Sequence, residues 1–246
     1  MKTYDDLAKF YYKRRQNKKR FDFNRDIEVP AMIKMIGPVR SKTILDIGCG
    51  FGDHAKTLSK KNPKKIIGFD VSKELVKIAK NLNIKNAEFY VGDMNKKLKF
   101  KDSTFDIVFS SLAIHYAKDI NKLFKEVKRV LKKGGIFVFS TGHPIFNLIN
   151  QTNNHIIGTK KTTGKRTIYG DYFDESFKIT EYGNTGKFIH RNLTYETLLK
   201  NGIKNGFELI DYEDAKPKSE TKKVDKEKHK LTTTLPTFIL FKFKKK

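Results

Sequence analysis

A regular alternation of short apolar runs with amphipathic segments, between residues 43 and 140, constrains the fold more than any other feature of the sequence. The apolar runs have the length of buried strands, and they are Thr43–Ile47, Lys65–Phe69, Ala87–Val91, Phe105–Ser110 and Ile136–Ser140. The segments between them predict helices over Asp53–Lys60, from the cap Ser72 to Asn81, and over Ile120–Leu131, with a stop at Gly134-Gly135. Strands and helices that alternate in this way form a doubly wound α/β fold, a parallel sheet with helices on both faces.

The C-terminal part of the sequence continues the pattern. Tyr195–Asn205 predicts a helix, and Phe207–Tyr212 and Thr237–Phe243 predict two further strands, which makes seven strands in all. Between those two strands, Lys216–Lys230 is charged and almost free of apolar residues, so we predict a surface loop there.

The flanking and inserted segments suggest three parts. Residues 1–40 predict a helical lid segment, and residues 41–246 predict the α/β domain. Basic and aromatic residues alternate between Phe10 and Phe23, so an arm that binds nucleic acid is the alternative for the first segment. Residues 144–190 are polar and rich in Gly, Thr and Asn, with aromatic islands, and predict an insertion on the acceptor side after the fifth strand.

Composition limits the class of protein. The only cysteine is Cys49, so no disulfide can form within the chain, and no metal site is expected. No apolar stretch reaches the roughly 18 residues that a membrane span needs, and Met1–Phe10 does not resemble a signal peptide, so we expect a cytoplasmic protein that does not bind membranes. The net charge of +25 would suit RNA, but it comes mostly from Lys spread over the whole chain, which favours a compositional origin.

A glycine-rich turn follows the first predicted strand, in the order Asp46-Ile47-Gly48-Cys49-Gly50-Phe51-Gly52. Such glycines allow a tight turn and a close approach of the backbone to a ligand. Asp70 ends the next strand, where an acid can accept both hydroxyls of a ribose. A dinucleotide fingerprint requires a third glycine where Asp53 stands, and Asp46 would lie poorly beside a pyrophosphate. Asp46 instead suits a ligand that carries an ammonium group and a sulfonium.

These residues resemble motif I of the class I S-adenosylmethionine-dependent methyltransferases, and other elements follow in the order of that family. Asp70 resembles the acid at the end of its second strand, and Gly92-Asp93-Met94 is similar to its adenine-binding segment. Residues 105–116 resemble its fourth strand with the following loop, and residues 126–135 resemble the helix and double glycine before its fifth strand. A narrower resemblance, in residues 142–146, 172–175 and 190–195, is to a type-11 (UbiE-like) subgroup and names no substrate.

The resemblance implies a Rossmann-like, mostly parallel sheet with an antiparallel last strand, and S-adenosylmethionine as the cofactor. The implied cofactor-binding residues lie at the ends of the predicted strands and are Asp46, Gly48, Cys49, Gly50, Gly52, Asp70, Val71, Asp93, Met94, Ser110 and Ser111. For Asp93, a role as a cap on the next turn is the alternative.

Candidate residues for catalysis and acceptor binding follow the later strands. His115 and His143 each stand near the cofactor site and could act as a general base, or each could be a structural histidine bonded to the backbone. Tyr172 and Glu175 are candidates to line the acceptor pocket. His190 and Arg191 could bind an anionic acceptor, or simply cap the helix that follows.

The sequence therefore predicts a methyltransferase acting on a small molecule, at oxygen or nitrogen more readily than at carbon, as a monomer or homodimer. The alternatives are a tRNA or rRNA methyltransferase that uses the basic surface, a non-catalytic module that binds the cofactor, and an NAD-dependent oxidoreductase. No Asn-Pro-Pro-Tyr or Asp-Pro-Pro-Tyr follows the fourth strand, which argues against an adenine-amino methyltransferase. The lack of a second cysteine disfavours covalent attack on a pyrimidine.

Overall fold

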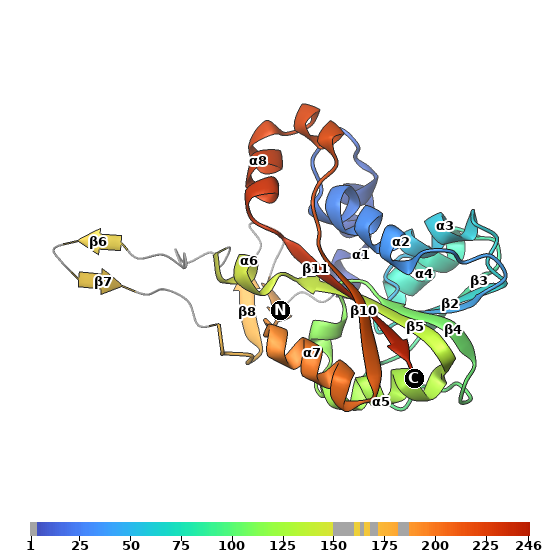
Figure 1. Ribbon diagram of the computed structural model, residues 1–246. Helices are drawn as coiled ribbons and strands as arrows, with labels where there is room; N and C mark the ends of the chain where they lie inside the picture. The colour runs from blue at the N-terminus through green and yellow to red at the C-terminus, as the bar shows by residue number, and fades with distance from the viewer. Residues whose placement is uncertain (1–3, 150–159, 163–164, 168–171, 182–186) are drawn as a thin grey trace.

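A computed structural model describes residues 4–149, 160–162, 165–167, 172–181 and 187–246, and it has the predicted α/β architecture. A seven-stranded sheet has the strand order β10-β11-β5-β4-β1-β2-β3 (Figure 1). Its strands are β1 (Thr43–Ile47), β2 (Lys65–Asp70), β3 (Ala87–Val91), β4 (Phe105–Ser110), β5 (Leu131–Gly142), β10 (Phe207–Asp214) and β11 (Phe238–Lys245). Only the last of these, β11, runs antiparallel to its neighbours β5 and β10, so the predicted topology is confirmed.

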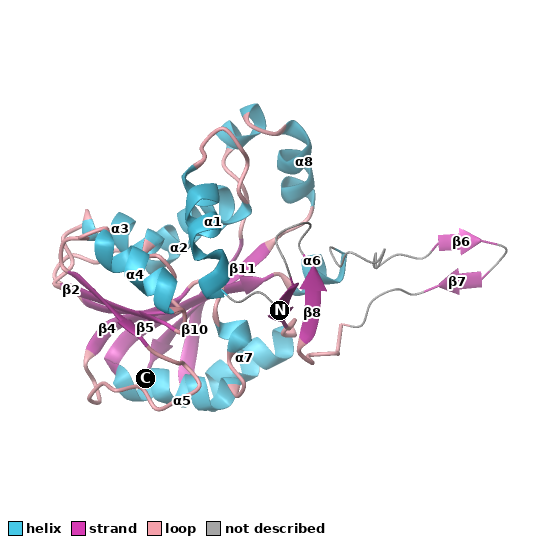
Figure 2. Cartoon of the chain, turned by 180° about the vertical axis from the view of Figure 1, so that it is seen from behind, coloured by secondary structure: helices cyan, strands magenta, loops and turns pink. Residues whose placement is uncertain are grey.

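Helices cover both faces of this sheet (Figure 2). The helices of the described residues are α1 (Tyr4–Gln16), α2 (Val29–Ile36), α3 (Asp53–Ser59), α4 (Lys73–Asn81), α5 (Ile120–Val130), α6 (Pro144–Ile149), α7 (Tyr195–Lys204) and α8 (Lys226–Thr234). Helices α2, α3 and α4 pack on one face of the sheet, while α5 and α7 pack on the other. Shorter helical turns are the π-helix Asn24–Glu28 and the 3-10 helices Ile114–Tyr116 and Ser219–Lys223.

The local sequence explains where the main helices begin. Ser72, Asp119 and Thr194 each accept a hydrogen bond from a backbone N–H in the first turn of the helix that follows, which satisfies one of the donors left free at a helix start. In α5, the apolar residues Leu123, Phe124 and Val127 recur at helical spacing and are buried against the sheet.

Central strands are buried on both faces, as a parallel sheet covered by helices requires. In β1, Leu45 and Ile47 belong to the core shared with α5 and α7, and Ile44 belongs to the core shared with α2 and α3. The order of the strands reverses between β1 and β4, and ligands bind such sheets outside the carboxyl ends of the strands at this point.

Two sequence predictions about local structure are wrong. The Gly134-Gly135 pair does not end a helix: α5 ends at Val130, and the pair lies inside β5, where the register with β4 shifts. Lys216–Lys230 is not a loop, because it contains a 3-10 helix and most of α8. The N-cap Asp225 accepts a hydrogen bond from the N–H of Lys228 and starts α8 despite its polar composition.

The predicted lid and insertion are described unevenly. The predicted boundary between lid and domain at residue 40 stays a prediction. Helix α2 packs into the core against β5 and β11, so only the residues before α2 can cover a pocket. Much of 144–190 lies outside the described residues. Within it, strands pair as two hairpins, β6 (Lys160–Thr162) with β7 (Lys165–Thr167) and β8 (Lys178–Glu181) with β9 (Lys187–His190).

Close packing of α7 on the sheet gives a first prediction. A Cβ atom added at Gly202 would lie 2.3 Å from the ring of Phe243, so we expect Gly202→Ala to destabilise the fold by about 1–3 kcal/mol through overpacking. Helix propensity alone would favour alanine by roughly 1 kcal/mol. Urea unfolding measures the difference, with exposed Lys200→Ala on the same helix as control; a stabilised Gly202→Ala variant would contradict this packing.

Candidate functional site

The turn after β1 is held in a conformation that favours glycine. Gly48, Gly50 and Gly52 have φ angles of 75°, 52° and 82°. A Cβ atom at Gly48 would lie 2.4 Å from the Cβ of Ala113, so the strand-to-helix turn and the loop after β4 approach each other closely. The N–H groups of Gly48 and Cys49 donate to the carbonyl of Phe69, at 2.9 and 3.0 Å, which ties the turn to the end of β2.

Asp70, at the end of β2, organises the neighbouring backbone. Its two carboxylate oxygens accept hydrogen bonds from the N–H groups of Gly50 and Ser72, both at 2.9 Å. Burial raises the pKa of Asp70, while these backbone donors act in the opposite direction. The hydroxyl of Ser72 donates to Asp5 on α1, which connects the N-terminal helix to this part of the site.

Asp46, at the end of β1, is a buried carboxyl with no partner. Its side chain is 1% exposed, and neither oxygen has a hydrogen-bond partner among the described residues. Burial, opposed by His54 and reinforced by the carboxyls of Asp70 and Glu28, raises the pKa of Asp46 to about 7. A buried carboxyl without a donor is costly, so Asp46 indicates a missing cationic or hydrogen-bond-donating ligand.

A second buried network, which the sequence analysis missed, lies behind Asp46. Glu28, from the π-helix before α2, is fully buried and accepts hydrogen bonds from Ser111 at 2.7 Å and Ser140 at 2.6 Å. The Nε2 atom of His54 lies 3.1 Å from the other oxygen of Glu28. Although burial opposes the charged forms, this pairing raises the pKa of His54 and lowers that of Glu28. The only sequence signal was an acid flanked by the apolar residues Ile27 and Val29.

These elements surround a cavity of about 680 Å³, within the usual range for small-molecule sites. The predicted site residues that line it are Gly48, Cys49, Gly50, Asp70, Val71, Asp93, Met94, Ser111, His115 and Arg191. Gly52 and Asp46 are not among the lining residues, and Ser110 is fully buried with its hydroxyl bonded to the carbonyl of Ile47. Asp93 also caps the next turn, as the alternative reading expected, because it accepts from the N–H of Asn95.

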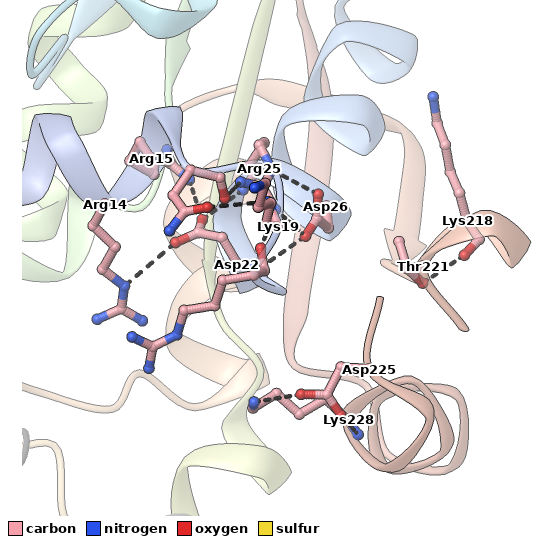
Figure 3. A network of polar contacts seen from close by, with 12 residues as sticks. Arg14, Arg15, Lys19, Asp22, Arg25, Asp26, Lys218, Thr221, Asp225 and Lys228 are labelled. Atoms are coloured by element: carbon pink, nitrogen blue, oxygen red, sulfur yellow. Dashed lines mark hydrogen bonds and ion pairs between the residues drawn. The ribbon is translucent and has the colours of Figure 1, made fainter. Parts of the chain in front are cut away.

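The N-terminal segment forms one wall of the cavity, and the sequence analysis named none of its side chains as site residues. Tyr4, Tyr11 and Phe23 line the cavity, and the hydroxyl of Tyr4 lies 2.6 Å from that of Tyr116, in the turn after β4. A polar network fixes the segment after α1 (Figure 3). There Arg15 donates to Asp22 at 2.9 Å, with both side chains 8% exposed.

The remaining candidates for catalysis and acceptor binding divide into two groups. His115 lines the cavity, and its Nδ1 lies 3.1 Å from the hydroxyl of Thr141. Arg191 lines it too, and its Nη2 donates to the carbonyl of Ala117. His143 is not among the residues that line it, and its role as a base stays a prediction. The Nε2 of His143 lies 2.7 Å from the hydroxyl of Tyr195, and its Nδ1 accepts from the N–H of Ile145.

Tyr172 and Glu175 are not among the residues that line the cavity, and both contact the start of α7, so their role in acceptor binding stays a prediction. At the start of that helix, Glu175 accepts one hydrogen bond from the N–H of Thr194 and another from the hydroxyl of Thr197. The hydroxyl of Tyr172 accepts from the N–H of Tyr195. For His190, only the backbone, in β9, is described, and the side chain lies outside the described residues.

The helices of the described residues include none that is long and apolar enough to cross a membrane. Within the same described ranges, no group of three or more His, Cys, Asp or Glu side chains is placed to hold a metal ion.

Comparisons with known proteins agree with this geometry. Residues 45–139 match the type-11 family model of a methyltransferase domain. A demethylmenaquinone methyltransferase of Thermotoga maritima is 29% identical, over 73% of this chain and 77% of its own length. The structure of an S-adenosylmethionine-dependent methyltransferase from Mesorhizobium loti superposes with a TM-score of 0.73 at 28% identity, covering 88% of this chain and 96% of that one. The structure of a methyltransferase of the same description from Listeria monocytogenes superposes with a TM-score of 0.73 at 26% identity, covering 89% of this chain and 95% of that one.

The sheet order, the glycine turn and the acid that ends β2 define a class I methyltransferase fold. Residues 45–139 of the chain are similar to the type-11 methyltransferase domain, and the relatives and solved structures named above, to which the chain is similar, are S-adenosylmethionine-dependent methyltransferases. The chain spans about half the length of the first curated relatives it matches, between 50% and 57%.

The buried carboxyl of Asp46 gives a prediction about pH. The pKa of Asp46 in the folded state, about 7, lies above the ordinary 3.8. The protonated carboxyl therefore contributes to the stability of the fold at low pH, and this contribution to stability is lost as the pH rises toward 7. We expect the free energy of unfolding of the ligand-free protein to fall, relative to Asp46→Asn, by about 3 kcal/mol between about pH 5 and about pH 8.

Urea unfolding of both proteins at the two pH values measures this difference. Asp211→Asn, on the edge strand β10 and exposed, serves as the matched control and should differ from the unmodified protein by the same amount at each pH. A constant difference between the unmodified protein and Asp46→Asn would show that Asp46 titrates normally.

Proposed function

We propose that this chain transfers the methyl group of S-adenosylmethionine to a small-molecule acceptor bound in the cavity beyond the glycine turn. The observation that carries the proposal is the excess of buried carboxyls around that turn. The carboxyls of Asp70 and Glu28 both act to raise the pKa of Asp46, and His54, which pairs with Glu28, is the cation among them. Such an excess of negative charge suits a ligand with an ammonium and a sulfonium group and opposes a pyrophosphate.

The residues present fit that cofactor. The carboxyl of Asp46 lacks a partner that an ammonium group would supply, and Gly48 and Gly50 leave the backbone open at the cavity. Asp70 lines the cavity and can accept hydrogen bonds from ribose hydroxyls beside its two backbone donors, because each carboxylate oxygen has more than one lone pair. Asp93 and Met94 line the same cavity and are proposed to contact the adenine.

When bound, the cofactor supplies a methyl group on a positively charged sulfur. The transfer is an in-line displacement, for which this chain mainly provides proximity and alignment. The aromatic wall of Tyr4, Phe23 and Tyr116 excludes water from the cavity and orders the acceptor. Where the acceptor must lose a proton, His115 is the candidate base, since it lines the cavity and Thr141 orients its ring.

A small acceptor is favoured over RNA by the form of the site. Aromatic and apolar side chains, such as Tyr4, Leu7 and Phe23, line the cavity beside its polar groups, which suits a compact molecule. The basic residues around it are partly neutralised within the chain: Arg15 pairs with Asp22 and Arg25 with Asp26. Contacts to RNA phosphates would need free cations and would weaken steeply with salt.

The test is transfer of label from methyl-labelled S-adenosylmethionine into cell extract, with and without RNase, at low salt and at about 0.3 M salt, where screening is strong. We expect label in small molecules, insensitive to RNase and persisting at the higher salt. A His115→Asn variant should bind the cofactor normally and transfer roughly 10²–10⁴-fold more slowly if a base is needed. Label found only in RNA and lost on RNase treatment would replace the small-acceptor proposal with the RNA alternative.

A further inference from the structure

Arg191 lines the cavity and has no counter-ion among the described residues. Its Nη2 atom donates to the carbonyl of Ala117 at 2.5 Å, and its guanidinium carbon lies 4.9 Å from the centre of the Phe177 ring. No ion pair among the described residues includes Arg191, and its Nε atom is buried without a hydrogen-bond partner. Burial lowers the pKa of Arg191 although Glu175 and Asp119 act in the opposite direction.

Two other arginines that line the cavity, Arg14 and Arg15, are already paired with carboxylates, which makes Arg191 distinct. Arg15 is held by Asp22 at 2.9 Å and by Asp53 at 3.6 Å, and Arg14 lies 3.5 Å from Asp22. A guanidinium that is partly removed from water and has no carboxylate partner leaves part of its desolvation cost uncompensated. Arg191 is therefore poised to gain stabilisation from an anion that enters the cavity.

Thr237 adds a second unused polar group. It lines the same cavity just before β11, is 5% exposed, and its hydroxyl has no partner among the described residues. Its backbone carbonyl, in contrast, accepts from the N–H of His143 at 2.8 Å, so the position of the residue is fixed by the sheet. Phe146 and Phe238 line the same cavity and provide an apolar surface for the rest of a ligand.

We propose that the methyl acceptor carries an anionic group, a carboxylate or a phosphate, which Arg191 binds with the help of the Thr237 hydroxyl. The inference rests on the proposed methyl transfer and adds the chemical class of the acceptor. Arg191 acts in specificity: it holds the acceptor by a charge-assisted hydrogen bond and takes no part in breaking the sulfur–methyl bond. Its loss should raise the KM for the acceptor far more than it lowers kcat.

The experiment fractionates the acceptor before the assay. Small molecules from the source cells pass through a filter that retains macromolecules and are then separated on an anion-exchange resin. Each fraction is incubated with the protein and methyl-labelled S-adenosylmethionine. We expect label with the retained fraction. Phosphatase treatment of that fraction distinguishes the two sources of charge, since it removes a phosphate acceptor and leaves a carboxylate acceptor.

Variants connect the anion to these residues. At a limiting concentration of acceptor, Arg191→Gln should form labelled product at a rate at least about tenfold lower than the unmodified protein does. Arg191→Lys should recover part of that rate, and Thr237→Val should reduce the rate less than Arg191→Gln does. Arg40→Gln, an exposed arginine before β1, is the matched control and should label normally. Titration with S-adenosylhomocysteine verifies that each variant is folded and binds the cofactor product.

The outcomes separate this inference from the proposed function. Label supported only by the unretained fraction, or equal labelling of the retained fraction by Arg191→Gln, overturns the anionic acceptor while methyl transfer stands. If Arg191→Gln does not bind S-adenosylhomocysteine, the labelling by Arg191→Lys and Thr237→Val tests the inference in its place. Normal labelling by both of these variants overturns the inference. An absence of label with both fractions, in a protein that binds the cofactor, overturns the small-acceptor function itself.

Discussion

The burial of the Asp46 carboxyl at the end of β1 is the constraint on which the site depends. The central strand brings an acid into the protein interior, immediately before a turn whose glycines have positive φ angles, and none of the described residues donates a hydrogen bond to it. Behind it lies a second buried pair, Glu28 and His54, which contact each other. The Glu28 carboxylate also accepts hydrogen bonds from the hydroxyls of Ser111 and Ser140. A ligand with a positive group is the partner that this arrangement lacks.

The fold provides the rigidity that such an arrangement needs. Hydrogen bonds from Gly48 and Cys49 to the end of β2, and from Gly50 and Ser72 to Asp70, lock the two strand ends together. Through the contact of Ser72 with Asp5, and of Tyr4 with Tyr116, the N-terminal helix is attached to both sides of the cavity. The N-terminal helix and the glycine turn therefore line one cavity, and Arg191 lines it as well.

Much of the fold could be predicted from the sequence because buried parallel strands are short, apolar and bounded by turns; β1, β3 and β4 have the predicted limits. Helix α8 could not be predicted, since it begins from an Asp225 cap and has no apolar stripe. Motif resemblance located the cavity-lining loops, but not Glu28 and His54, whose roles arise only when distant segments meet. For the same reason the sequence could not show that His143, Tyr172 and Glu175 contact α7.

Calorimetric titration of the ligand-free protein with S-adenosylhomocysteine, and separately with NAD, tests the central claim most directly. We expect S-adenosylhomocysteine to bind at micromolar affinity, about −8 kcal/mol, and NAD not to bind. We also expect a loss of about 2–4 kcal/mol in a folded Asp70→Ala variant, since charge-assisted bonds to the ligand are removed. Asp211→Ala, an exposed acid on β10, should bind as the unmodified protein does. Binding of NAD in preference, or an unchanged affinity in Asp70→Ala, would contradict the assignment of this site.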